Sequence, residues 1–297
     1  MIFDFLRNKK KRDQLDSTYH HIKKSLISDL RRIPYWKMLS DEIKYVSDMS
    51  SVTIGKDADK MPLPPSNLRY GYHNDNDEQY LISGREEAKR FDDLARKYGA
   101  EIKRGRLLDF GCSSGRILRH FTRYPNADLY GVDIEAPTIE WALSQLPQSL
   151  KFVPITTFPH LPFEDSYFDI VISNSVFTHI RDLAIMTLVE LRRILRPGGI
   201  GLITICDDYS YQQYRNNPRL FLKGTYMHSI GIKHGDFHME KIPGDFLVHA
   251  FGPCSAVFYR QSYLRHVWGR FFDICEIIPF CPNETFRSVV IMRKPAA

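Results

Sequence analysis

The stretch Leu107-Leu-Asp-Phe-Gly-Cys-Ser-Ser-Gly-Arg-Ile-Leu-Arg119 decides the fold of this chain. Its short apolar run predicts a buried strand, and Gly111 and Gly115 predict a tight turn that opens a helix over 115–124. At such a turn the backbone can approach a ligand closely, and the start of the helix offers N–H groups to an anion. The stretch therefore predicts a strand–turn–helix unit that binds a nucleoside-containing ligand with an anionic group.

Strands and helices alternate on both sides of this unit. The predicted elements are strands at 106–110, 129–132, 151–154, 169–173, 200–205, 271–278 and 286–293, and helices at 77–97, 115–124, 137–146, 183–195 and 261–270. Such an alternation is typical of a parallel sheet that is covered by helices on both faces. We therefore predict an α/β fold.

The chain divides into four predicted segments. Residues 1–65 form a basic helical arm and a linker, 66–206 the ligand-binding core, 207–256 an insertion, and 257–297 the helix and strands that complete the sheet. Residues 1–32 hold nine basic and four acidic side chains, a net charge of +5 out of +6 for the whole chain. A basic arm over 1–33 is suited to contact with an anionic membrane face or nucleic acid. The alternative is a helix that is solvated or contacts a protein partner, without an anionic ligand.

The composition is that of an ordinary globular protein, with 43% hydrophobic and 26% charged residues. No apolar run approaches the roughly 20 residues that span a bilayer, and the first residues do not form a signal peptide. The five cysteines are odd in number and form no C-x-x-C pair, which favours reduced thiols and a cytoplasmic location. His234 and His238 have the spacing of metal ligands, but a third ligand is lacking, so we expect no metal.

A dinucleotide fingerprint does not fit the turn. The pattern G-x-G-x-x-G would place glycines at 111, 113 and 116, where the chain has Gly111, Ser113 and Arg116. NAD and FAD are therefore disfavoured as ligands.

The same stretch resembles motif I of the class I S-adenosylmethionine-dependent methyltransferases, D-x-G-x-G-x-G. Asp109, Gly111 and Gly115 match the motif, while Ser113 replaces its middle glycine. Asp133 ends the second predicted strand, where an acidic side chain can accept hydrogen bonds from both ribose hydroxyls of a nucleoside. The segments 161–169 and 195–199 also resemble marks of the family, and the resemblance covers about residues 104–206 and 261–293.

The resemblance implies a fold, a cofactor and a set of binding residues. The fold is a seven-stranded, mostly parallel Rossmann-like sheet in the order 3-2-1-4-5-7-6, with the last strand antiparallel and a lid inserted after strand 5. The cofactor is S-adenosyl-L-methionine, whose methionine carboxylate faces the start of the helix. The expected cofactor-binding residues are Asp109, Gly111, Cys112, Ser113, Gly115, Asp133, Ile134, Thr157, Asn174 and Ser175.

A hydroxyl or ammonium acceptor must lose a proton during methyl transfer, so a base is expected beside the methyl group. Our candidates are His179 after the fourth strand, Asp207 after the fifth, and His228 and His249 in the insertion. His179 could equally cap the backbone at the start of a helix, and Asp207 could simply form a turn. The aromatic side chains of the insertion suit either stacking on an acceptor or a small core of their own.

We therefore predict an enzyme that methylates a small molecule or a glycan, on oxygen in preference to nitrogen. One alternative is a subunit that binds the cofactor without catalysis and serves regulation or scaffolding. A nucleic-acid methyltransferase is disfavoured, because Asn174-Ser-Val-Phe177 stands where base-methylating enzymes have Asn/Asp-Pro-Pro-Tyr/Phe. The nearly neutral body of the chain also lacks an extended basic groove, so we expect no nucleic-acid partner.

Overall fold

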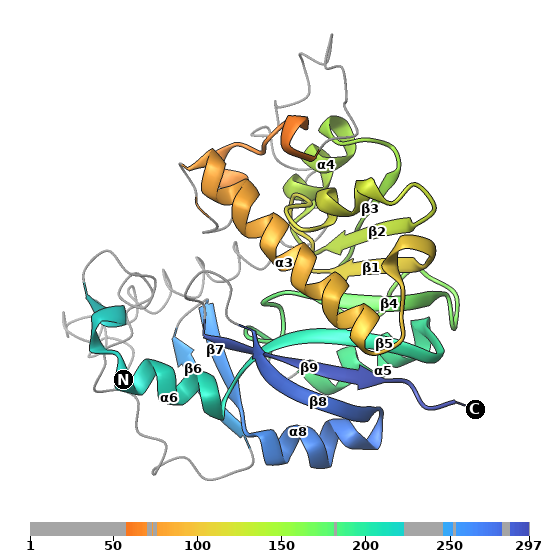
Figure 1. Cartoon of the computed structure of the whole chain (residues 1–297). Helices are drawn as coiled ribbons and strands as arrows, with labels where there is room; N and C mark the ends of the chain where they lie inside the picture. The colour runs from red at the N-terminus through yellow and green to blue at the C-terminus, as the bar shows by residue number, and fades with distance from the viewer. Residues whose placement is uncertain are drawn as a thin grey trace, which may run out of the picture.

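The computed structural model of the 297-residue chain describes residues 58–69, 73, 76–180, 183–222, 246–251, 254–280 and 286–296 (Figure 1). The predicted arm over 1–33 lies outside the described residues, as do His228, His234 and His238. None of the helices in these ranges is long and apolar enough to cross a membrane.

The elements follow one another in the predicted alternation. The strands are β1 (Arg106–Phe110), β2 (Asp128–Asp133), β3 (Leu150–Pro154), β4 (Phe168–Ser173), β5 (Leu195–Asp207), β6 (Phe246–Phe251), β7 (Cys254–Tyr259), β8 (Asp273–Phe280) and β9 (Arg287–Arg293). The α-helices are α3 (Asp77–Lys97), α4 (Ala136–Gln145), α5 (Ala184–Ile194), α6 (Asp208–Asn216) and α8 (Gln261–Val267). The 3-10 helices are η2 (Ala58–Lys60), η3 (Ser66–Leu68), η4 (Ile102–Arg104), η5 (Leu118–Arg123), η6 (Pro218–Phe221) and η9 (Trp268–Arg270).

The main sheet has the predicted class and direction. Strands β3, β2, β1, β4 and β5 are neighbours in that order and run parallel. The last strand, β9, lies antiparallel between β5 and β8. With β8 and β9 counted as the sixth and seventh strands, the order is the expected 3-2-1-4-5-7-6. The carboxyl ends of β1 and β4 therefore meet at one edge of the sheet, where open α/β sheets bind ligands.

Two strands were not predicted. β6 and β7 form an antiparallel hairpin, and β7 also pairs in parallel with Cys206 and Asp207 at the end of β5. Within the described residues the sheet thus has nine strands, and β7 runs three residues past the expected end of the insertion at 256. Figure 1 shows α6 and this hairpin at the carboxyl end of β5.

The predicted helix over 115–124 is confirmed only in part, because it begins three residues later than expected and is a 3-10 helix. Residues 113–117, which follow Gly111, form turns, and a 3-10 helix begins only at Leu118. The cause is local, because Ser113 and Gly115 have φ angles of +49° and +77°, which no right-handed helix accepts. A predicted boundary also differs: β5 starts at Leu195 and includes the segment 196–199 that was expected to precede it.

The longest helix, α3, illustrates why the layers form. Asn76 caps it by accepting a hydrogen bond from the backbone N–H of Gln79 over 2.9 Å. Ala88, Phe91 and Ala95 recur at helical spacing and are fully buried against the sheet. Figure 1 shows α3 lying across one face of the strands.

The core has two halves, one on each face of the sheet. Leu107 and Leu108 are adjacent in β1 and both fully buried, so they point to opposite faces that are each covered. Residues of α3, η5 and α4 pack on one face, and residues of α5, α8 and η9 pack on the other. Burial on both faces fixes the ends of β1 and β4, and with them the candidate site.

Candidate cofactor site

A pocket opens at the carboxyl ends of β1 and β4. Its lining residues are Arg69, Tyr80, Asp109, Gly111, Cys112, Ser113, Arg116, Ile117 and Asn174. Five of the expected cofactor-binding residues, Asp109, Gly111, Cys112, Ser113 and Asn174, thus lie together. Gly115, Asp133, Ile134, Thr157 and Ser175 are outside the lining. Arg69, Tyr80, Arg116 and Ile117 were missed by sequence reasoning.

The two glycines of the turn are required for different contacts. Gly111 has a φ of +83°, and a Cβ at this position would overlap the side chain of Val176. Gly115 has a φ of +77°, and a Cβ there would lie 2.9 Å from Cζ of Phe152 and 3.0 Å from Cδ1 of Leu146. Glycine at 115 is therefore demanded by packing on β3 and the end of α4, where we had expected a role in ligand approach.

Ser113 takes the strained position of the turn. Its φ of +49° is a conformation that favours glycine, the residue that the family motif has there. Its backbone N–H donates to Oδ2 of Asp133 over 2.7 Å. Its hydroxyl is buried and has no hydrogen-bond partner among the described residues, so a polar group remains to be satisfied in the pocket wall.

Asp133 lies behind this turn at the end of β2, with 9% of its surface exposed. Its Oδ1 accepts a hydrogen bond from the backbone N–H of Glu135 over 2.9 Å. Burial raises the pKa of the Asp133 carboxyl to about 6, although these backbone donors lower it. Ile134 is half-buried beside it, and Thr157 is exposed in the bend that follows β3.

Asp109 is the most unusual group in the pocket. It is 1% exposed at the end of β1, and neither carboxylate oxygen has a hydrogen-bond partner among the described residues. Burial raises its pKa to about 8; Arg116 opposes this shift, and Asp133 and Glu87 add to it. A buried acid without donors is costly, so the pocket lacks a hydrogen-bond donor at this point.

Arg116 belongs to a buried network beneath the pocket. It donates to Oε2 of Glu87 over 2.5 Å and to the hydroxyl of Ser83 over 3.1 Å. The amide of Asn174 donates to the same Glu87 oxygen over 2.8 Å, and its Oδ1 accepts from Thr204 over 3.2 Å. These bonds fix the orientation of Asn174 at the end of β4. Ser175, half-buried with a φ of +65°, bonds to Thr204 and Thr178.

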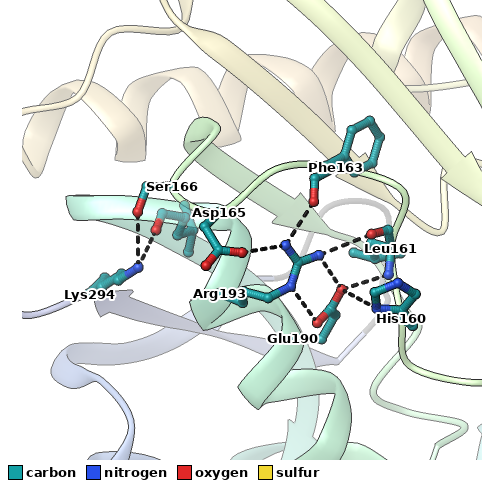
Figure 2. A network of polar contacts seen from close by, with 9 residues as sticks. His160, Leu161, Phe163, Asp165, Ser166, Glu190, Arg193 and Lys294 are labelled. Carbon is teal, nitrogen blue, oxygen red and sulfur yellow. Dashed lines mark hydrogen bonds and ion pairs between the residues drawn. The ribbon is translucent and has the colours of Figure 1, made fainter.

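The loop that links β3 to β4 is held by one ion-pair network (Figure 2). Arg193 of α5 donates to the backbone oxygens of Leu161 and Phe163 over 3.0 and 2.8 Å, and to Asp165 over 2.7 Å. Glu190 binds Arg193 with both oxygens and accepts the backbone N–H of Leu161 over 2.6 Å. This network raises the pKa of the Arg193 guanidinium and fixes the loop that begins near Thr157.

The candidate bases differ in position. His179 is exposed in the turn after β4, and its backbone N–H bonds to the oxygen of Val176 over 2.9 Å. His249 lies in β6, in register with Ala256. His228 is outside the described residues. The described part of the chain holds no cluster of three metal-ligating side chains.

Asp207 has a structural environment. It is fully buried and caps α6 by accepting the backbone N–H of Ser210 over 3.1 Å. Ser288 donates to Oδ1 over 2.9 Å, and Gln261 donates to Oδ2 over 2.8 Å. Because both oxygens are occupied, the expected role of Asp207 in orienting an acceptor has no support in its contacts.

Described aromatic side chains of the insertion pack against the protein itself. Tyr211 and Tyr214 of α6 meet Phe258 edge-on, with ring centroids 6.2 and 6.1 Å apart. Tyr214 also contacts Phe286 at 5.7 Å. Because Phe258 and Phe286 lie outside the insertion, these contacts join the rings of α6 to the body of the protein rather than to a separate core of the insertion.

Comparison with known proteins identifies the core of the chain. A family model described as a methyltransferase domain matches residues 108–203. An uncharacterised methyltransferase of Schizosaccharomyces pombe is 35% identical over 107 residues, which cover 33% of this chain and 38% of that protein. A malonyl-[acyl-carrier protein] O-methyltransferase of Geobacter sulfurreducens is 28% identical over 131 residues, which cover 43% and 49%. The chain thus spans less than half of the length of these curated relatives.

A solved structure is similar in fold over most of this chain. The 1,6-didemethyltoxoflavin-N1-methyltransferase of Burkholderia thailandensis, crystallised with 1,6-didemethyltoxoflavin and S-adenosylhomocysteine, has a TM-score of 0.51 and 16% identity, covering 79% of this chain and 92% of that one. At this identity the likeness is evidence of fold alone. Residues 108–203 thus match a methyltransferase domain, and the strand order around them is that of a Rossmann-like fold.

Proposed function

We propose that this chain is an S-adenosylmethionine-dependent methyltransferase that binds its cofactor in the pocket at the ends of β1 and β4. The observation that carries the proposal is Asp109, whose two buried oxygens have no donor among the described residues. The cofactor of this family has an ammonium group, a ribose and a sulfonium, and an ammonium group is the kind of donor that Asp109 lacks. The pocket therefore fits the cofactor on its own chemistry.

Two acidic residues divide the recognition of the cofactor. Asp109 accepts the α-ammonium group at the floor of the pocket, and Asp133 accepts the ribose hydroxyls. Each Asp133 oxygen already accepts one backbone N–H but keeps a second lone pair. Gly111, Cys112 and Ser113 supply the wall between them, and Asn174 closes the side toward β5. Ile134, Thr157 and Ser175 stay predicted neighbours of the nucleoside.

When bound, the cofactor supplies an activated methyl group on a positively charged sulfur. The chain contributes alignment of the acceptor with that methyl group and exclusion of water. A hydroxyl acceptor also needs a proton acceptor, and His179, His249 and His228 remain the proposed bases. His179 is favoured among them because it follows β4 at the same edge of the sheet as the pocket.

We propose oxygen of a small molecule or glycan as the acceptor. The malonyl-[acyl-carrier protein] O-methyltransferase that matches this chain supports oxygen, while the N1-methyltransferase with a similar fold keeps nitrogen as the alternative. A cytoplasmic location, with residues 1–33 as a peripheral contact to a membrane or a protein, also remains part of the proposal. Deletion of 1–33 should leave cofactor binding intact, because every proposed cofactor residue lies downstream.

The function is tested by incubating full-length protein with S-adenosylmethionine carrying a labelled methyl group and a panel of hydroxylated small molecules, glycans and amines. Release of S-adenosylhomocysteine that depends on an added acceptor supports the enzyme, and His179→Ala should then lower kcat with little effect on cofactor affinity. Tight cofactor binding without turnover on any acceptor would instead favour the non-catalytic subunit.

A further inference from the structure

The loop that follows β4 carries the favoured base and packs on the glycine turn. It consists of residues 175–180 and includes His179. A Cβ at Gly111 would overlap the side chain of Val176, so the loop and the turn are in direct contact. The backbone N–H of His179 donates to the oxygen of Val176 over 2.9 Å. The position of this loop therefore decides where His179 lies relative to the pocket.

The other side of the loop is bonded to β7, which lies outside the matched domain. The backbone N–H of Val257 donates to the oxygen of Thr178 over 2.9 Å. The hydroxyl of Tyr259 lies 2.9 Å from the oxygen of Ile180 and 3.2 Å from the oxygen of Phe177. Its one proton is thus shared between two carbonyl groups, one on each side of the proposed base.

Tyr259 is itself held firmly. It is 2% exposed, and its ring packs edge-on against Trp268 with centroids 5.5 Å apart. Trp268 also packs on Phe177 at 5.2 Å, so it contacts both the tyrosine and a loop residue to which the tyrosine bonds. Burial raises the pKa of the Tyr259 hydroxyl, which therefore keeps its proton and remains a donor.

The strand that carries Tyr259 is fixed to the main sheet. Phe258 and Tyr259 pair in parallel with Cys206 and Asp207 at the end of β5. The ring of Tyr259 buries apolar surface whether or not it carries a hydroxyl, and Tyr259 does not line the cofactor pocket. The hydroxyl therefore acts on the carbonyl groups of the loop, and its removal should leave the cofactor pocket in place.

We propose that Tyr259 is a positioning residue that holds the loop 175–180, and with it His179, between the glycine turn and β7. This inference rests on the proposed function, in which His179 accepts the proton of the acceptor. Tyr259 acts through the backbone of the loop. Its hydroxyl should therefore matter for turnover and not for cofactor affinity, because a small displacement of a base slows the transfer steeply.

The test compares Tyr259→Phe with the control Tyr167→Phe in the full-length protein. Each variant keeps the ring and loses one hydroxyl, and that of Tyr167 bonds to the hydroxyl of Tyr130 at 2.7 Å, next to the other end of β4. Both are made alone and together with His179→Ala. Calorimetry gives the Kd of S-adenosylhomocysteine, hydrogen exchange reports on residues 175–180, and kcat is measured with an acceptor found in the panel above.

Tyr259→Phe should lower kcat by roughly 10- to 100-fold and leave the Kd within about twofold. In the His179→Ala background it should lower kcat by less than about threefold, because the group that it positions is gone. Loop amides should exchange roughly tenfold faster in Tyr259→Phe. Tyr167→Phe should have the same small effect on kcat in both backgrounds and none on the loop.

An equal loss of kcat in both backgrounds would overturn the inference, because Tyr259 would then act independently of His179. Equal weakening of cofactor affinity and kcat would also overturn it, since the whole site would be disturbed. If Tyr259→Phe does not fold, the wild type decides: slow exchange over 175–180 supports a held loop, and fast exchange contradicts it. If no acceptor is turned over by the wild type, the proposed function fails, while exchange in Tyr259→Phe still shows whether the tyrosine holds the loop.

Discussion

Ser113 donates its backbone N–H to Oδ2 of Asp133 over 2.7 Å, and this bond joins the turn after β1 to the end of β2. The two places are twenty residues apart in the chain and belong to adjacent parallel strands. The carboxylate that is proposed to hold the ribose therefore also shapes the loop that is proposed to surround the amino-acid group. A change at Asp133 should be felt in both parts of the site.

Asp133→Ala should weaken S-adenosylmethionine binding by about 1–3 kcal/mol, because the ribose hydroxyls lose a charged acceptor and the turn loses its anchor. Calorimetry with the folded variant measures the effect. Asp133→Asn is the matched control, since its Oδ1 still accepts one backbone N–H, and it should lose less. If Asp133→Ala binds the cofactor like the wild type, the ribose assignment is wrong.

Ser113→Gly should stabilise the protein without cofactor by about 1 kcal/mol, because glycine adopts the φ of +49° without the clash of a side chain. In a chain of this size, that gain corresponds to a rise in Tm of roughly 1–2 °C. Thermal unfolding followed by circular dichroism is the measurement. The control is Ser114→Gly, which lacks the positive φ and should lower Tm instead, so a fall in Tm for Ser113→Gly would refute this explanation.

Gly115→Ala should destabilise the fold by about 2–4 kcal/mol through its φ of +77° and its contacts with Phe152 and Leu146. Because the cause is packing, Phe152→Leu in the same chain should recover part of the loss. Urea unfolding of the single and double variants measures this coupling. Strictly additive losses would show that the contact with Phe152 is not the cause.

Cofactor affinity should rise with pH between 6.5 and 7.5. Burial raises the pKa of the Asp109 carboxyl to about 8, and only the ionised carboxylate pairs with an ammonium group. Affinity for S-adenosylhomocysteine should therefore increase up to tenfold per pH unit in this range. Asp109→Asn should bind more weakly and lose this dependence, while a wild-type affinity that is flat with pH would contradict the role of Asp109.

The same group gives the opposite slope for the stability of the protein without cofactor. The folded state holds the Asp109 proton more tightly than the unfolded chain, whose pKa is near 3.8. Stability from this group is thus complete below about pH 4 and is lost as the pH rises toward 8. At pH 8, the free energy of unfolding of Asp109→Asn should exceed that of the wild type by about 1–3 kcal/mol. Urea unfolding of both proteins measures this difference.

The sequence predicts the parallel sheet well, because runs such as Leu107–Phe110 and Phe168–Ser173 are buried on both faces and read as apolar segments. It misjudges the helix after the turn, since the backbone angles of Ser113 and Gly115 depend on tertiary contacts with Asp133, Phe152 and Leu146. The hairpin of β6 and β7 left one signal that went unused: two apolar runs separated only by Gly252-Pro253.

The candidate site also contains residues that the sequence predicts and residues that it does not. Asp109 and Ser113 follow from the motif because they lie next to the glycines. Arg69 could not be found in this way, because it reaches the pocket from the start of the predicted core segment 66–206, forty residues before the motif. Asp207 carried a readable signal, since an acidic residue three positions before Ser210 at a helix start is typical of a cap.

The central claim is tested most directly by calorimetry on the purified full-length chain with S-adenosylmethionine, S-adenosylhomocysteine and NAD. We predict that both adenosyl ligands bind with a Kd below about 1 mM, which corresponds to more than roughly 4 kcal/mol of binding free energy. NAD should bind more weakly, because Ser113 and Arg116 replace two glycines of the dinucleotide pattern. Tighter binding of NAD than of S-adenosylmethionine, or no heat with either adenosyl ligand, would contradict the account.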